Sequence, residues 1–209
     1  MKSAKVDQRR EAGQRTRTRL MDAALDLLAE RGEDGVTLRE LTAAADANVA
    51  AVSYHFGSLK ALCEASVEHA LERYLDAQEE ALRALGAEPS LEGVAAAFAR
   101  PMMRALSTGG RDLDVMRIVA RAGIDPPDGW ARFGTRFDRI RADVVGVLKP
   151  HVAGEGDREL AFRVRLAAGL LNWVALAPVG AALRNSSERT IERRLVPVVA
   201  GTLAGTSAT

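Results

Sequence analysis

The stretch TLRELTAAADANVAAVSYHFGSLKAL, from Thr37 to Leu62, decides the fold of this chain. Its apolar residues recur at spacings that place them on the inward faces of two short helices and of the start of a third. This pattern is typical of a helix-turn-helix, which holds its second helix at the surface. The inward residues are Leu38, Leu41, Ala45, Val52 and Phe56, and the outward ones are Arg39, Asn48, Ser53, Tyr54 and Lys60.

Residues that begin and end helices set the boundaries of these elements. Thr37 is a good N-cap and Glu40 stands three residues later, so the pair predicts a capping box at the start of the first helix. Asp46 falls in the turn, where a positive φ is often required and where Asp is tolerated better than most side chains. Asn48 is then expected to cap the second helix.

These residues resemble the DNA-binding domain of the TetR family of bacterial repressors. The match runs from LMDAALDLLAERG, at Leu20 to Gly32, through GVTLREL to VSYHFGSLKAL, and YHFGS is its most specific segment. The chain departs from the family pattern twice. Many members have a glycine where this chain has Asp46, and a lysine directly after the serine where it has Leu59, with Lys60 one place later. Beyond about residue 70 the family has no dependable motif.

The second helix, Asn48 to Phe56, is expected to enter the major groove of a palindromic operator of double-stranded DNA. Ser and Asn hydrogen-bond base edges or phosphate, Ala meets a thymine methyl, and a Tyr hydroxyl more often takes a phosphate. Ser58 is expected to cap the third helix and to place Lys60 beside a phosphate oxygen. The candidate DNA-binding residues are Thr37, Asn48, Ala50, Ala51, Ser53, Tyr54, His55 and Lys60.

The first twenty residues are strongly basic. Lys2, Lys5, Arg9, Arg10, Arg15, Arg17 and Arg19 are opposed there only by Asp7 and Glu11. Residues 1–15 are expected to form a disordered arm that reaches phosphates or a minor groove, or else stays a solvated tail. A DNA-binding domain at 16–60 and a C-terminal ligand-binding and dimerisation domain at 61–209 are expected to follow.

Composition favours an all-α fold. The chain has 209 residues, 47% of them hydrophobic, with only seven prolines. A single cysteine, Cys63, excludes an internal disulfide and fits a reducing cytosol, and no secretory signal is visible, so a cytoplasmic location is expected. Further helices are expected at about 59–85, 90–106, 112–122, 130–148, 157–183 and 188–203.

Enzyme signatures are not found in the sequence. The three histidines, His55, His69 and His151, lie far apart, and no paired cysteine or carboxylate cluster has metal-ligand spacing. We therefore expect no enzyme activity and no cofactor. The alternative is an all-α small-molecule-binding protein or enzyme that carries a degenerate helix-turn-helix.

The segment LAAGLLNWVALAPVGAAL, from Leu166 to Leu183, contains no charged residue. Its length admits a membrane span, but its alanines, Asn172 and Pro178 favour a helix buried on one side in its own domain and on another in a partner. The resemblance implies a homodimer formed by the last two helices, with no membrane partner. The candidate dimerisation residues are Leu166, Leu170, Val174, Leu195 and Val199.

The middle of the chain gathers Met and aromatic residues that suit an apolar or amphipathic small-molecule effector. The simpler interpretation is that the same residues form plain hydrophobic core. The resemblance implies that ligand entry moves the long helix after Lys60 and releases the operator. The candidate ligand-binding residues are Phe98, Met102, Met103, Met116, Trp130, Phe133, Phe137, Leu170 and Trp173.

Overall fold

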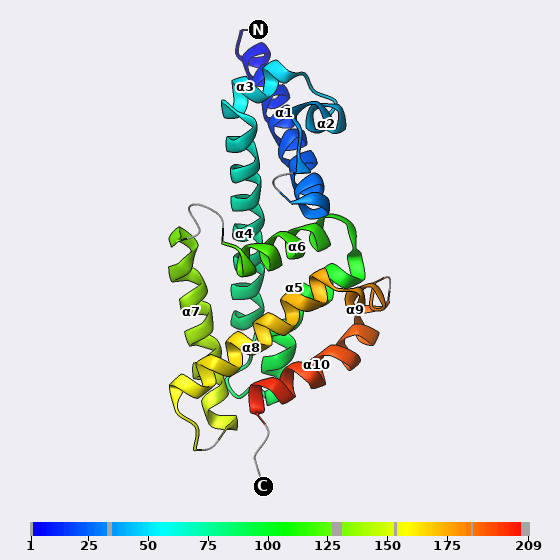
Figure 1. Cartoon of the computed structure of the whole chain (residues 1–209). Coiled ribbons are helices and arrows are strands. Elements are labelled where there is room, and N and C mark those ends of the chain that lie inside the picture. Colours follow the sequence, from blue (N-terminus) through cyan, green and yellow to red (C-terminus); the bar gives the residue numbers. More distant parts are fainter. Residues whose placement is uncertain (1, 33–34, 127–130, 153, 185, 206–209) are drawn as a thin grey trace. The chain divides into compact units, whose positions relative to one another are not determined.

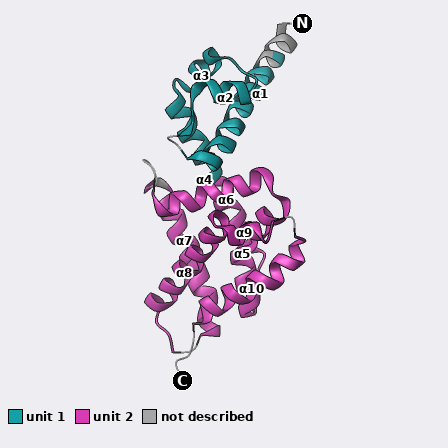
Figure 2. Cartoon of the chain, turned by 45° about the vertical axis from the view of Figure 1, so that its right-hand side comes forward, with its two compact units in different colours: residues 1–70 teal, residues 71–209 magenta. Residues whose placement is uncertain are grey.

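The computed structural model describes residues 2–32, 35–126, 131–152, 154–184 and 186–205. Every regular element within these ranges is a helix, as the composition predicted (Figure 1). The chain divides into two compact units, residues 1–70 and residues 71–209 (Figure 2). The elements are α1 (Lys2–Arg31), α2 (Leu38–Ala44), α3 (Val49–Phe56), α4 (Leu59–Arg83), α5 (Leu91–Thr108), α6 (Gly110–Ile124), α7 (Ala131–Leu148), the short 3₁₀ helix η2 (Lys149–His151), α8 (Asp157–Leu176), α9 (Pro178–Ala181) and α10 (Glu188–Ala204).

The first unit packs α1, α2, α3 and the start of α4 around one apolar core. Leu20 and Leu25 of α1, Leu41 of α2 and Leu62 of α4 are fully buried, and Val52 of α3 joins them. Burial of each such side chain stabilises the fold by about 1.5–3 kcal/mol. The inward positions expected from the helix-turn-helix pattern are therefore buried, with Leu38 and Phe56 only half-buried.

The structure differs from the sequence-based expectation at the N-terminus. Residues 1–15 were expected to form a disordered arm, but α1 begins at Lys2 and continues without a break to Arg31. The segment contains good helix formers, chiefly Ala, Lys, Arg, Gln and Glu, and no proline. An i,i+4 pair between Glu11 and Arg15, with 3.8 Å between Oε2 and Nη1, adds local support.

The boundary between the units also lies elsewhere than expected. A boundary after residue 60 would fall in the first turn of α4, whereas the units separate after Ala70, inside that helix. The helix α4 is thus one continuous element that contributes to both units. Its bounds agree with the predicted helix at 59–85 to within two residues.

In the second unit α5 packs against α6, α7, α8 and α10, while α8 also packs against α6, α7 and α10. The uncharged segment was expected to end a single helix at 157–183. The structure instead divides that helix into α8 and α9. Pro178 has no N–H to donate and forces Ala177 into an extended conformation, with φ −89° and ψ 162°. Gly180 then passes so close to the carbonyl of Val174 that a side chain there would collide with it.

Pro101 lies inside α5 and leaves one backbone carbonyl without its helical partner. The missing N–H would have bonded the carbonyl of Ala97, four residues earlier. Gln78 of α4 is fully buried, and its Nε2 donates to that oxygen at 3.3 Å. Gln78 therefore compensates for the proline and ties α4 to α5. The buried Oε1 of Gln78 has no hydrogen-bond partner among the described residues.

This arrangement predicts a coupled effect of two substitutions. Gln78→Leu should lower the free energy of unfolding by about 1–3 kcal/mol, because it leaves the Ala97 carbonyl buried and unpaired. In a Pro101→Ala background the helix supplies its own N–H, so the same substitution should cost clearly less. Urea denaturation of the four proteins measures the coupling, and equal costs in both backgrounds would contradict it.

Candidate DNA-binding interface

The start of α2 carries the predicted capping box. Thr37 Oγ1 accepts a hydrogen bond from the backbone N–H of Glu40 at 3.3 Å and donates to Glu40 Oε2 at 2.6 Å. Arg31 of α1 also donates to Glu40, with 2.9 Å between Nη1 and Oε1. The hydrogen bond from Thr37, followed by that from Arg31, lowers the pKa of the Glu40 carboxyl below its ordinary value. Thr37 thus stabilises the start of α2, and it remains exposed.

The turn before α3 has the conformation that was expected for Asp46. Asp46 adopts a φ of 46°, in the left-handed region that favours glycine. Its carboxylate accepts a hydrogen bond from Arg19 of α1, with 3.2 Å between Nη1 and Oδ2. Asn48 caps α3, because its Oδ1 accepts from the backbone N–H of Ala51 at 2.8 Å. The ion pair of Asp46 and the cap by Asn48 therefore both fix the point where α3 begins.

The outer face of α3 is mainly apolar. Val49 is 50% exposed and Tyr54 is 84% exposed. Ala50 and Ser53 are also exposed, whereas Ala51 and His55 are half-buried. The ring of His55 meets the ring of Tyr54 edge-on, with 4.9 Å between the centroids.

A concave surface lies between α3 and α1 and includes most of the predicted DNA-binding residues. It is lined by Thr16, Arg19, Asp46, Ala47, Asn48, Ala50, Ala51, Tyr54 and His55. Sequence reasoning missed Thr16 and Arg19 on this surface and Val49 beside it. Val49 could have been found from its place at the first position of α3, where recognition helices meet bases. No local pattern indicates Thr16 or Arg19, because only the packing of α1 brings them beside α3.

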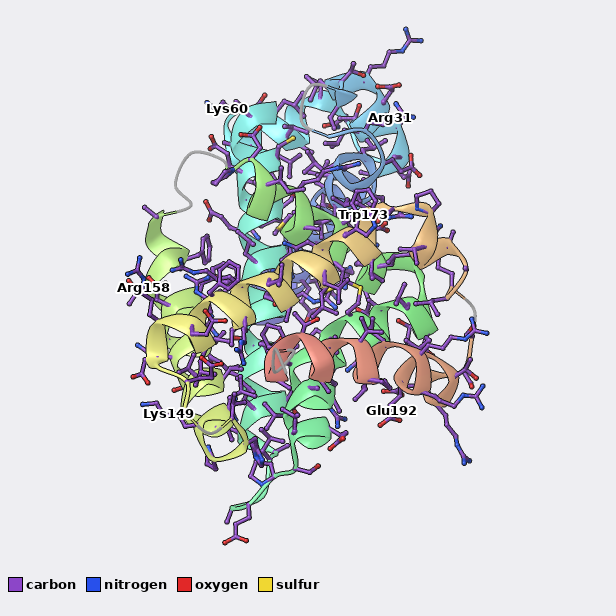
Figure 3. All side chains as sticks on the ribbon, turned by 60° about the horizontal axis from the view of Figure 1, so that its bottom comes forward. Arg31, Lys60, Lys149, Arg158, Trp173 and Glu192 are labelled. Atoms are coloured by element: carbon purple, nitrogen blue, oxygen red, sulfur yellow. The ribbon has the colours of Figure 1, made fainter. Side chains whose placement is uncertain are left out.

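Lys60 lies in the first turn of α4, as predicted (Figure 3). Ser58 Oγ accepts a hydrogen bond from the backbone N–H of Ala61 at 3.1 Å, which confirms the expected cap. The Lys60 ammonium is exposed and lies 3.7 Å from Glu64 Oε1, one turn further along the helix. Any phosphate contact of Lys60 therefore competes with an intramolecular ion pair.

Further basic residues of α1 contact the unit itself. The Arg17 guanidinium lies over the ring of Phe56 at 4.9 Å from the centroid, and its Nη1 is 3.1 Å from the sulfur of Met21. Arg19 is paired with Asp46, and Arg31 is paired with Glu40. Basic side chains of α1 therefore also hold this helix to the helix-turn-helix.

The predicted ligand-binding residues that the structure describes are partly buried, partly half-buried and in one case exposed. Phe98, Met102, Met103 and Met116 belong to one buried cluster, and Phe133 is also buried. Phe137 is half-buried and stacks on Tyr74 of α4, with 6.0 Å between the ring centroids. Leu170 is half-buried at the edge of the cluster, Trp173 is 64% exposed, and Trp130 lies outside the described residues.

The predicted dimerisation residues also separate. Leu166 is exposed and Leu170 is half-buried, but Val174, Leu195 and Val199 are buried in the core of their own unit. The expectation that these three residues face a partner does not match the structure. Consecutive helical residues point in directions about 100° apart, so a segment apolar on all sides does not show which residues face inward. The exposed apolar residues of this region are Phe162, Leu166, Trp173, Leu176, Val179 and Val198.

Comparison with known proteins agrees with this architecture. Residues 20–65 match the family model described as bacterial regulatory proteins, tetR family. Among solved structures, AibR in complex with isovaleryl coenzyme A and operator DNA is 15% identical, with a TM-score of 0.65, over 91% of this chain and 98% of that chain. PfmR, a TetR family transcriptional regulator from Thermus thermophilus, is 18% identical, with a TM-score of 0.64, over 91% of this chain and 97% of that chain.

A transcriptional regulator from a Rhodococcus species is 19% identical, with a TM-score of 0.62, over 90% of this chain and 95% of that chain. No curated protein sequence matches the chain significantly. At these identities the structural matches show the fold, while the family model covers the helix-turn-helix itself. Fold and motif together define a helix-turn-helix regulator with a helical C-terminal unit.

The helix-turn-helix at residues 20–65 is therefore that of the TetR family of bacterial regulatory proteins, in a chain that has the fold of TetR-family transcriptional regulators. None of these matches supports the alternative of an enzyme with a degenerate helix-turn-helix. Within the described part of the chain, no helix has the length and apolar character needed to cross a membrane.

The ion pair at the start of α4 predicts opposite effects of two substitutions. Lys60→Ala should weaken binding to all duplexes and lower the slope of log affinity against log salt by about one unit for each lost phosphate contact. Glu64→Gln should strengthen binding slightly, because it removes both a competitor for Lys60 and a negative charge. Fluorescence anisotropy at several salt concentrations measures both effects. An unchanged affinity and slope for Lys60→Ala would remove this residue from the interface.

Proposed function

We propose that the chain is a homodimeric repressor, which binds a palindromic operator and is released from it by a small apolar or amphipathic effector. The exposed outer face of α3 is the observation that carries the operator contact. Asn48, Ala50, Ala51, Ser53 and Tyr54 lie on this face or at its start, with His55 behind them. Tyr54 and Lys60 take phosphates, which position the protein without specifying sequence. This activity places the protein in the cytoplasm, with the chromosome.

Selection from a random pool of duplexes tests the operator proposal directly. The expected result is a family of palindromes whose half-sites are about one helical turn apart, roughly 34 Å, because a dimer presents two recognition helices to successive major grooves. Binding that never becomes sequence-specific would overturn the proposal. Removal of Tyr54 provides the control, since Tyr54→Ala should lower affinity for every selected sequence alike.

The exposed apolar face of α8 supports a homodimer. Phe162, Leu166, Trp173 and Leu176 follow one another at intervals of four, seven and three residues, so they lie along one side of the helix. Val198 of α10 is exposed too, and α10 packs beside α8. A contiguous apolar surface of this kind is typical of a protein–protein interface. We infer that this face, rather than Val174, Leu195 and Val199, meets the second copy.

The two faces of α8 predict different outcomes for the same charge. Leu166→Glu should leave each protomer folded but split the dimer, because the charge is exposed in the protomer and unpaired in the interface. Val174→Glu should unfold the chain, since it places the charge in the core at a cost of several kcal/mol. Sedimentation and thermal melting separate these results.

Ile124→Glu is the matched control for this experiment. Ile124 is an apolar residue of α6 that is 72% exposed outside the face of α8, so the dimer should persist. A Leu166→Glu protein that still sediments as a dimer at micromolar concentration would contradict the proposed interface.

A groove on the second unit supports an effector site. It lies between α4, α5 and α6 and is lined by Arg73, Tyr74, Asp76, Ala77, Glu80, Pro101, Arg104, Asp112, Val115 and Met116. Met116 connects its floor to the buried Met and Phe cluster. Burial raises the pKa of the Tyr74 hydroxyl to about 12.

Two arginines and three carboxylates line the groove, namely Arg73 and Arg104 with Asp76, Glu80 and Asp112. Arg73 lies 3.0 Å and Arg104 3.5 Å from the Asp112 carboxylate. The side chain of Arg104 is 73% exposed, so an anion can approach it without breaking the core. An amphipathic anion would place its apolar part over Pro101 and Met116, and its charge would displace the Asp112 carboxylate from the two arginines. One fold neighbour has been solved with isovaleryl coenzyme A, a ligand of this chemical type.

Isovaleryl coenzyme A is therefore the first probe for release from the selected operator, followed by short branched carboxylates. Arg104→Ala should weaken the effect of an active compound about tenfold, which corresponds to about 1.4 kcal/mol. Arg100→Ala is the matched control, because Arg100 is an exposed arginine of α5 that does not line the groove. Anisotropy of a labelled operator measures release. If both substitutions change the potency of an active compound equally, the effector site lies elsewhere.

A further inference from the structure

The first turn of α3 offers DNA a surface made almost entirely of methyl groups. Val49 and Ala50 are exposed and Ala51 is half-buried, and none of these three side chains can form a hydrogen bond. They occupy the first three positions of α3, where the N-terminal residues of a recognition helix contact base edges. Ser53 and Tyr54, the next exposed polar side chains of the helix, stand about one turn later.

Polar groups around this turn make contacts within the protein. Asn48 Oδ1 accepts from the backbone N–H of Ala51 at 2.8 Å, so the cap of the helix holds this side chain. On the opposite wall the Thr16 hydroxyl donates to the carbonyl of Ala12 at 3.1 Å. Arg19 donates to Asp46 at 3.2 Å, in an exposed ion pair at the turn before α3.

The major groove has one apolar feature, the C5 methyl group of thymine. A G·C pair opposite Val49 would have its donors and acceptors desolvated against methyl groups without a replacement partner, which is unfavourable. An A·T pair with its thymine toward Val49 instead buries one apolar group against another. The chemistry of this turn therefore discriminates by contact with a methyl group rather than by hydrogen bonds.

We propose that Val49, with Ala50 beside it, is a specificity-determining residue that recognises the thymine C5 methyl in each half-site of the operator. The inference rests on the proposed operator binding and adds to it the class of base pair and the kind of contact. Sequence at the remaining positions is then read by Ser53 and by the shape of the DNA.

Replacement of single thymines by deoxyuridine in the selected operator tests the proposal, because this change removes the methyl and leaves every hydrogen-bonding group in place. At one or two positions per half-site, affinity should fall about fourfold, the value of one buried methyl-sized group, about 0.8 kcal/mol. With both half-sites changed the loss should exceed about tenfold. At the same positions 5-methylcytosine paired with guanine should bind more tightly than cytosine, because the two differ only in the methyl group.

The protein side of the experiment uses Val49→Ser and Val49→Asn, which have no methyl group. Val49 is half-exposed at the start of a helix, so neither change should disturb the fold, which circular dichroism checks. Both proteins should bind the thymine and deoxyuridine operators almost equally at the sensitive position, and Ser53→Ala, the control from the same helix, should retain the full difference.

The outcomes are distinct. An operator whose affinity is unaffected by deoxyuridine at every position, while other base changes abolish binding, would overturn this inference and leave the proposed function intact. Sensitivity to deoxyuridine that persists in Val49→Ser and Val49→Asn would also overturn it, because another residue would then contact the methyl. A chain that selects no specific duplex would overturn the proposed function itself.

Discussion

Whatever α3 presents to DNA depends on how it is anchored, because an eight-residue helix has almost no stability of its own. Val52 is the buried side chain of α3, in the same unit as the buried leucines of α1, α2 and α4. The Asn48 cap fixes the first turn, and Asp46 fixes the chain direction just before it. This anchoring uses the inner face and the N-terminal end of the helix, so the outer face remains available for contact.

Ion pairs give the DNA-binding unit a second property. Arg19 with Asp46, Arg31 with Glu40 and Lys60 with Glu64 all lie at the surface. Pairs of this kind add about 0–1 kcal/mol to stability, so exchange of a carboxylate for a phosphate costs the fold little. They also reduce the positive field that the unit presents to DNA at long range. Affinity of such a unit relies on shape and contact at the recognition helix as well as on charge.

The second unit combines a tightly packed core with two features that the core does not require. The apolar outer face of α8 remains uncovered in the single chain, although the inner face of the same helix is already buried. Pro101 interrupts the hydrogen bonds of α5 directly beside the groove, and the buried Gln78 compensates from α4. The helix α4 is continuous from Leu59 to Arg83, so Tyr74 and Gln78 belong to the same helix as Lys60.

Local signals in the sequence were enough to determine the helix-turn-helix, its caps at Thr37, Asn48 and Ser58, the strained turn at Asp46 and the order of the later helices. These features depend on residues a few positions apart, so a short stretch of sequence contains their cause. Only the tertiary structure decided which side of α8 is exposed, because a helix that is apolar on all sides has no periodic signal. It alone placed Arg19 beside Asp46 and Gln78 beneath Pro101, since these contacts join residues far apart in the chain. The position of Val49 follows from the sequence, but its exposure at the start of α3 depends on how the unit packs.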